Sequence, residues 1–319
     1  MRTVLRRLVQ LVVVVLCVTF FSFLLLTLIP GDPVTAIVGF ASPADHKTIA
    51  HELHLDQNVF QRYGEWLGGF LHGDLGKQYF GPTGRGEVST AIGQHFGATL
   101  ELMLYAMTLT LIIAIPMGVF AAYKAGTLFD RIANVTAFGC IALPDFALAL
   151  VLSYWVGVKW GVLPAQGFVR FRDDPYQSLR SLTLPAISLA VGQIAAYMRL
   201  LRSDMIATLQ EDYILMAKAK GMPTRRILWR HALRPSSLTL LTVAGLNIGA
   251  LIGGTVVIEV IFGIPGMGTE LYTAIFERQF VELQSIVALI AIGFVLINVA
   301  IDLLYTVLDP RIRDARAVG

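Results

Sequence analysis

Four acidic residues lie within the stretches of this 319-residue chain that are predicted to be membrane helices: Glu101, Asp145, Glu259 and Asp302. Charged side chains are expensive inside a membrane, and those found there often mark a path for ions or substrates. Glu101, Glu259 and Asp302 fall within a turn or two of predicted helix ends, where water can reach them, so structural or interfacial roles are expected. Asp145 falls near the middle of a predicted helix beside Pro144. We expect these two residues to line a translocation pathway, with packing on a partner subunit as the alternative.

Other motifs that carry chemistry are weak or missing. His51 and His54 are three residues apart and share one face of a helix, but the sequence supplies no third ligand, so we predict a solvated polar face and no metal site;. The chain lacks the H-E-x-x-H and G-x-S-x-G motifs of enzymes and the G-x-x-x-x-G-K-[ST] loop that holds nucleotide phosphates;. We therefore expect no catalytic residues and no cofactor bound by this chain.

The elements that must position these residues are membrane helices. The chain is 55% hydrophobic and only 15% charged, more apolar than one soluble core can hide;. A membrane-spanning helix needs about 20 mainly apolar residues. Six such stretches predict an all-α integral membrane protein. The helices are expected at about 8–28, 99–122, 132–157, 182–201, 236–260 and 284–306.

Basic residues indicate how these helices are oriented. If the amino terminus is cytoplasmic, 16 of the 25 lysines and arginines fall on the cytoplasmic side, and the other 9 fall in loops that are together longer. Because lysine and arginine accumulate in cytoplasmic loops, both termini are predicted to be cytoplasmic. The first apolar run is too long for a cleaved signal peptide and is interpreted as a membrane helix. Cys17 and Cys140 both fall in predicted membrane helices, so no disulfide is expected;.

The segment from Ile29 to Ala98 is predicted to be extracytoplasmic and partly helical. Pro30 and Pro33 cannot continue the first helix;. Ser42–Pro43 should begin a short helix, with serine as the cap and proline in the first turn. A second helix is expected around Val59 to Leu71, with its apolar residues at helical spacing, and Gly73–Gly76 should end it;.

The segment 202–235 changes from apolar to amphipathic. Asp212 to Lys220 contains strong helix formers, with an acid at its start and lysines in its last turn;. Gly221 is a natural residue to follow the helix end, and Pro223 prevents continuation. Thr224 is predicted to cap a further helix, Arg225 to Leu233, which Pro235 should stop. Although each arginine alone could serve only as a topology signal, two capped helices hinged at a glycine would present a rigid knob to a partner. The modest positive charge and few aromatics do not favour nucleic-acid binding.

The segment 202–235 resembles a loop of a known protein family. The segment Asp212 to Gly221, followed by His231-Ala232-Leu233-Arg234, is similar to the cytoplasmic EAA loop of ABC importer permeases, in the form of the dipeptide and oligopeptide systems. The general loop pattern begins Glu-Ala-Ala, where this chain has Leu215-Met216-Ala217. After Arg278, Gln279–Phe280 replaces the usual acid and aromatic. The resemblance extends over nearly the whole chain and includes Pro30-Gly31-Asp32-Pro33, Leu55-Asp56, Gly73-Asp74-Leu75-Gly76, Thr99-Leu100-Glu101-Leu102, Pro144, Leu163-Pro164, Leu184-Pro185-Ala186, Glu259, Phe262, Pro265-Gly266-x-Gly268 and Asp309-Pro310-Arg311-Ile312-Arg313.

The resemblance implies a type I ABC importer permease of six transmembrane helices, the B-type subunit of a dipeptide or oligopeptide importer in the cytoplasmic membrane. Its expected partners are a second, similar permease, one or two P-loop ATPase subunits that bind ATP and magnesium, an extracytoplasmic binding protein and the peptide itself. The implied regions are 1–28, 29–98, a five-helix core 99–306 with the coupling loop 202–235, and a tail 307–319. The ATPase-coupling residues would be Asp212, Tyr213, Leu215, Met216, Ala217, Lys218, Ala219, Lys220, Gly221 and His231. The alternative function is a proton-coupled secondary transporter.

Overall fold

A computed structural model describes residues 2–28, 34–35, 47, 50–51, 57–80 and 84–308. The chain divides into two compact units. The first comprises Met1–Thr99 with Pro265–Val299, and the second comprises Leu100–Ile264 with Ala300–Gly319. Two long helices, α5 (Val88–Tyr123) and α13 (Phe280–Leu308), contribute residues to both units. The turn at Pro30–Pro33, the helix expected from Ser42–Pro43 and His54 all lie outside the described residues.

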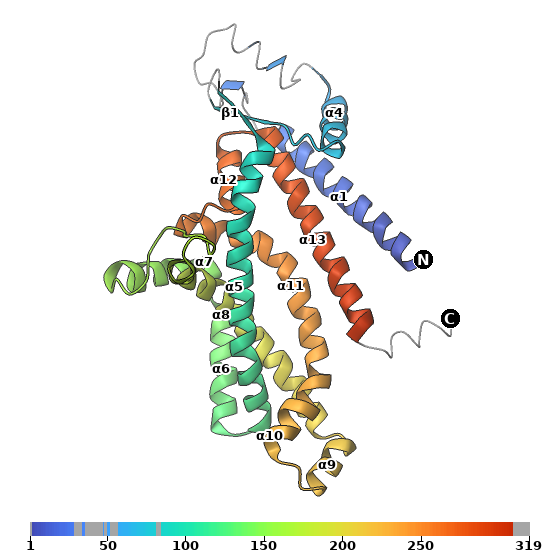
Figure 1. The fold of residues 1–319 in the computed structure, drawn as a ribbon, viewed down its shortest axis with the longest axis vertical. Coiled ribbons are helices and arrows are strands. Elements are labelled where there is room, and N and C mark those ends of the chain that lie inside the picture. Colours follow the sequence, from blue (N-terminus) through green and yellow to red (C-terminus); the bar gives the residue numbers. More distant parts are fainter. Residues whose placement is uncertain are drawn as a thin grey trace. The chain divides into compact units, whose positions relative to one another are not determined.

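In the first unit, an amphipathic helix packs on the first apolar helix. Helix α1 spans Arg2–Leu28, and α4 spans Val59–Leu71, where the sequence predicts it (Figure 1). Asn58 caps α4, because its side-chain oxygen accepts a hydrogen bond from the Gln61 N–H at 2.9 Å;. Tyr63 packs edge-to-face on Phe20 and Phe23 of α1. The aromatic residues of α4 therefore form the face that binds α1.

A short β-hairpin follows α4, although the sequence analysis predicts no strand. Strands β1 (Lys77–Phe80) and β2 (Gly84–Glu87) are antiparallel, and Tyr79 pairs with Arg85. Gln279, just before α13, accepts a hydrogen bond from the Tyr79 N–H at 3.0 Å and donates one to the Tyr79 carbonyl at 2.6 Å. An amide can both donate and accept, so this side chain acts as an extra strand partner. The departure at Gln279 from the family pattern thus has a structural explanation.

A second glutamine joins the hairpin to α12 (Met267–Phe276). Gln78 donates hydrogen bonds to Glu270 of α12, at 2.8 Å, and to Glu282 of α13. Gln78, Gln279 and Glu282 are all buried. Because buried polar groups are costly when unpaired, this hydrogen-bonded set specifies how the hairpin sits on the α12–α13 corner.

The second unit is a helical bundle built around α8 (Pro175–Leu209), which packs against α6 (Leu128–Ala142), α7 (Asp145–Leu152) and α11 (Leu233–Phe262). Asp174 caps α8 by accepting hydrogen bonds from the Tyr176 and Gln177 N–H groups, and Pro175 occupies the first turn;. The remaining elements are the π-helix η1 (Ser153–Lys159), α9 (Asp212–Ala219), α10 (Thr224–Arg226) and the π-helix η2 (Ile227–Ala232).

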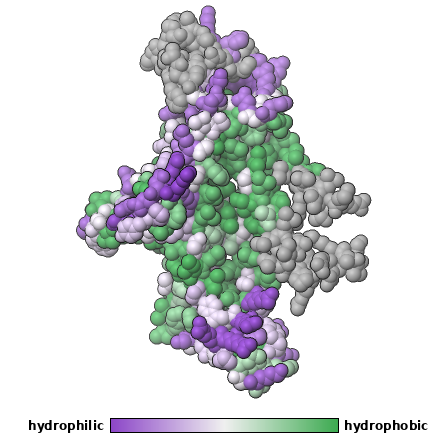
Figure 2. Space-filling view, in the orientation of Figure 1, coloured by the Kyte–Doolittle hydropathy of each residue, from purple (hydrophilic) through white to green (hydrophobic). Residues whose placement is uncertain are grey.

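Within the part of the chain that the structure describes, four helices are long and apolar enough to cross a membrane. They are α5, α8, the stretch Thr224–Phe262 and residues Phe280–Ile301 of α13. Helix α6 and the α7–η1 segment qualify together as a fifth, bent span, and α1 supplies a shorter apolar run, Val12–Leu25. The total of six therefore stays a prediction. In the view of Figure 2, hydrophobic residues dominate the surface of α5, and hydrophilic residues gather where α9 and α10 lie.

Candidate functional site

Helix α9 ends in the conformation that the sequence predicts. Lys220 is its C-cap, and Gly221 follows in the left-handed region with φ 71°. The Gly221 N–H donates to the Lys218 carbonyl at 2.9 Å, and the Met222 N–H donates to the Ala217 carbonyl at 3.2 Å. These two bonds form a Schellman motif, which satisfies carbonyls that the helix end leaves free. The direction of the chain after α9 is thus set by hydrogen bonds at one glycine.

One face of α9 anchors the helix. Ile214 is 0% exposed and Ala217 is 5% exposed, and α9 packs against η2 and α8. Tyr213, Leu215 and Met216 are 47%, 51% and 60% exposed. The other predicted coupling residues on this segment, Asp212, Lys218, Ala219, Lys220 and Gly221, are also exposed. The helix therefore presents apolar and charged groups on its outer side, as a protein-binding helix would.

The phenol of Tyr213 is neutral on this surface. Partial burial, and secondly the Glu211 carboxylate, raise the pKa of the Tyr213 phenol. Both effects disfavour the negatively charged form. A phenol is already neutral at pH 7 at its ordinary pKa of about 10, so Tyr213 keeps a hydroxyl donor beside two exposed apolar side chains. Ile214 anchors the helix together with Ala217, although it is not among the predicted coupling residues. Their spacing of three residues places both on one face of the helix, which could have indicated this role.

Two predictions about the following helix are wrong. Thr224 does not cap it: Pro223 is the N-cap residue, Thr224 is the first residue of α10, and no side chain caps the helix. Pro235 does not stop it, because η2 runs directly into α11. Proline clashes with the carbonyl four residues earlier, which here belongs to His231 in the widened π-helical turn, so the wider turn accommodates the ring. His231 is half-buried, and its Nε2 has no hydrogen-bond partner in the described part of the chain.

The predicted third helix, 132–157, is not one helix. Helix α6 ends at Ala142, and α7 begins at Asp145 after a bend of 95° (Figure 1). Leu143 has φ −82° and ψ 123°, outside the helical region, because the ring of the following proline disfavours helical backbone at the residue before it. Pro144 therefore breaks the helix that the sequence predicts over 132–157.

Asp145 consequently occupies the first turn of α7 and not the middle of a helix. Its side chain is exposed, and a Cβ placed on Gly192 of α8 would lie 3.7 Å from its Oδ1. A carboxylate in a first turn interacts favourably with the helix dipole. The break thus places a carboxylate on an open surface beside a glycine, which is an arrangement that can bind a cation or hold water.

The other acids differ in their surroundings. Glu101 accepts a hydrogen bond from the Phe171 N–H at 3.1 Å. Glu259 is 0% exposed, so the expectation that water reaches it is wrong. The reason is that α11 ends inside the protein: the Gly167 N–H donates to the Phe262 carbonyl at 2.9 Å and covers the last turn. The side chain of Asp302 lies outside the described set.

An ion pair that was not predicted from the sequence joins α6 to α8. Arg202 donates to Asp130 from Nε at 2.5 Å and from Nη2 at 2.7 Å. From the sequence, Arg202 is only one of the basic residues that indicate topology. Asp130 and Arg202 are 72 positions apart, so no local pattern predicts that they form a pair. The pair is one polar link between the helix that ends at the break and the helix that leads to α9.

A family model for the binding-protein-dependent transport system inner membrane component matches residues 114–314, and one for the N-terminal part of such membrane components matches residues 1–96. The chain belongs to this family. A putative peptide transport system permease protein of Brucella abortus is 40% identical over 97% of this chain and 98% of its own length. The dipeptide transport system permease protein DppB of Escherichia coli is 35% identical over 98% of this chain and 99% of its own length.

A structural relative confirms the expected fold. A chain of the MetNI methionine ABC transporter, in an inward-facing conformation, superposes with a TM-score of 0.55 at 16% identity. The match covers 69% of this chain and 96% of that chain. The fold is therefore that of an ABC importer permease, as the family resemblance implied. Neither the family models nor the relatives support the proton-coupled alternative.

Proposed function

We propose that this chain is the transmembrane permease subunit of an ATP-driven importer of dipeptides or short oligopeptides. The observation that carries the proposal is α9, a helix whose end is fixed by hydrogen bonds and whose outer face exposes Tyr213, Leu215 and Met216. Such a helix suits a groove on an ATPase subunit, which would move it during nucleotide turnover. The peptide cargo is inferred from the names of relatives that are 35% to 40% identical over nearly the whole chain.

The working complex would contain three kinds of protein besides this chain. A second, homologous permease would form a heterodimer with it, and one or two P-loop ATPase subunits would bind ATP and magnesium. An extracytoplasmic binding protein would deliver the peptide, and the cytoplasmic membrane would hold the permeases. This chain would hydrolyse nothing itself. The coupling residues would be Asp212 to Gly221 with His231, and Asp145 and Pro144 would line the translocation pathway.

Reconstitution tests this function directly. The chain, its partner permease and the ATPase subunits are placed in proteoliposomes with the binding protein, and ATP hydrolysis and uptake are measured with candidate cargoes. Peptide-loaded binding protein is expected to stimulate hydrolysis and ATP-dependent uptake. Stimulation only by haem or a nickel complex would reject peptides as the cargo, and stimulation only by glutathione, a γ-linked tripeptide, would reject ordinary dipeptides and oligopeptides. Uptake driven by a proton gradient without ATP would reject the importer itself.

Topology gives an independent prediction. Lys77 on β1 and Lys220 after α9 are both exposed, and the distribution of basic residues places them on opposite sides of the membrane. Single cysteines at these positions, with Cys17 and Cys140 replaced, should react with a membrane-impermeant maleimide from opposite sides, Lys77→Cys from outside. Labelling of both from the same side of intact cells would contradict the predicted orientation.

A further inference from the structure

The ion pair between Asp130 and Arg202 has the geometry of a rigid joint. Asp130 is 4% exposed, and the two parallel bonds from Arg202 meet both of its oxygens. A two-point contact of this kind fixes the relative orientation of the two side chains, whereas a lysine would supply only a point charge. The pair therefore constrains the angle between α6 and α8 as well as their distance.

Each oxygen of the Asp130 carboxylate accepts two hydrogen bonds. Besides Arg202, Asp130 Oδ2 accepts a hydrogen bond from the Gly126 N–H at 2.9 Å, and Oδ1 accepts one from Asn134 Nδ2 at 2.9 Å. Gly126 belongs to the turn between α5 and α6, where its φ is 81°. Asp130 thus ties three parts together, namely the α5–α6 turn, α6 and α8. Removing Arg202 would leave the buried Asp130 carboxylate without a charged partner, which is strongly destabilising.

The position of the pair in the chain connects two parts of the proposed machinery. Arg202 precedes the last residue of α8, Leu209, by about 10 Å along the helix axis, at about 1.5 Å per residue. Only Gln210 and Glu211 separate α8 from α9. Asp130 lies near the start of α6, whose other end is the break at Pro144.

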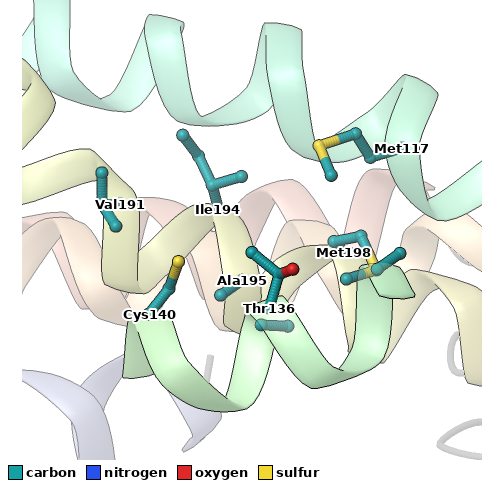
Figure 3. Close-up of a pocket in the computed structure, with 9 residues that line it drawn as sticks. Met117, Thr136, Cys140, Val191, Ile194, Ala195 and Met198 are labelled. Carbon is teal, nitrogen blue, oxygen red and sulfur yellow. The ribbon is translucent and has the colours of Figure 1, made fainter. Parts of the chain in front are cut away.

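Helices α6 and α8 pack directly on each other, and two hollows lie where α5 approaches α8. A cavity of about 140 Å³ lies among α5, α6 and α8, and Figure 3 shows Met117 of α5, Cys140 of α6 and Ile194 of α8 around it. A larger cavity of about 560 Å³ separates Tyr123 and the α5–α6 turn from Ile206 of α8 and Lys218 of α9. Cavities remove dispersion contacts that would otherwise hold helices together. The ion pair therefore adds a fixed orientation to the direct packing that already joins α6 to α8.

We propose that Asp130 and Arg202 are positioning residues whose two-point ion pair makes α6 follow α8 when α9 moves, and so carries the motion to the helix break at Pro144. The inference rests on the proposed function, because it requires an ATPase that acts on α9. Neither residue contacts nucleotide or cargo in this scheme. The pair acts only through the helices that it joins.

The test compares ATP hydrolysis with and without peptide-loaded binding protein in the complete reconstituted complex. Asp130→Asn and Arg202→Lys each remove the two-point ion pair, and Arg202→Lys keeps the positive charge. Both are expected to lower the stimulated-to-basal ratio by about fivefold or more, the lower range of allosteric coupling, while the basal rate is retained. The matched control is Arg131→Gln, which removes an exposed charge next to Asp130 and should leave the ratio unchanged.

A covalent link separates positioning from mere stabilisation. In a background with Cys17 and Cys140 replaced by alanine, Asp130→Cys/Arg202→Cys should be poorly coupled. A bis-methanethiosulfonate reagent that bridges the two thiols should restore coupling and peptide uptake, and a reducing agent should abolish them again. Modification with a one-armed reagent should restore nothing.

The outcomes are distinct. A wild-type complex without peptide stimulation would refute the proposed function. A stimulated wild type with equally stimulated Arg202→Lys, or a bridged double cysteine variant that remains uncoupled, would refute only the role of the ion pair. If Asp130→Asn fails to assemble, Arg202→Lys tests the proposal alone. The lysine keeps the positive charge at this position but cannot make the two-point contact that fixes the orientation of the pair.

Discussion

Replacing Gly221 with valine is expected to lower peptide-stimulated ATP hydrolysis by about tenfold or more, in a permease that still inserts and assembles. Gly221 has φ 71°, a conformation that costs an ordinary residue about 1–2 kcal/mol, where 1.4 kcal/mol is a factor of about ten. A β-branched residue is restricted further. A Cβ at this position would meet no atom within 4 Å. The effect would therefore come from the backbone and not from a clash.

The strain would act on the direction of α9. With valine, the backbone would escape the left-handed region, and the bonds from Gly221 to Lys218 and from Met222 to Ala217 would be lost;. The membrane helices do not depend on these bonds. The ATPase subunits would consequently dock poorly, or hydrolyse ATP without responding to the loaded binding protein. The measurement is the stimulated-to-basal ratio in reconstituted complexes.

Two variants control this experiment. Gly221→Asn should retain most of the coupling, because asparagine tolerates the left-handed region better than other residues with a side chain. Arg226→Ala, which changes an exposed residue of α10 outside the proposed coupling residues, should stay within roughly twofold of the wild type, since surface substitutions cost little. Normal coupling in Gly221→Val would show that the segment serves only as a topology signal.

Replacing Asp145 with leucine should lower peptide uptake by about tenfold without loss of assembly, a factor that corresponds to about 1.4 kcal/mol. The carboxylate is exposed at the start of α7 beside Gly192, so its removal breaks no packing of this chain. Leucine also inserts into membranes far more readily than aspartate. If the break lines the pathway, the loss of this charge should disfavour water and polar cargo there. Uptake of labelled peptide into proteoliposomes measures the effect.

Asp145→Asn is the matched control, because it keeps the size and polarity of the side chain and removes only the charge. An intermediate uptake would indicate that polarity and charge both contribute. Full uptake by a correctly assembled Asp145→Leu complex would assign the acid to packing on the partner permease or to no role.

Much of the architecture could be predicted from the sequence, because its causes are local. Long charge-poor stretches define membrane helices through their length and composition alone. The spacing of apolar residues in 59–71 predicts the helix α4, and Gly221 with Pro223 predicts where α9 ends;. In each case the physical reason involves residues within about one turn of one another.

Other features were decided only by tertiary structure, because they depend on residues far apart in the chain. The ring of Pro144 stops the helix locally, but the 95° bend is held by the packing of α7 on α8 and α11. Pro235 remains within a helix because a widened turn precedes it, and Glu259 is buried because a distant loop covers the end of α11. The pairing of Gln279 with Tyr79 and of Asp130 with Arg202 joins residues 200 and 72 positions apart. No local pattern encodes such pairs, since each residue type is equally compatible with a solvated surface until the fold brings its partner within hydrogen-bonding distance.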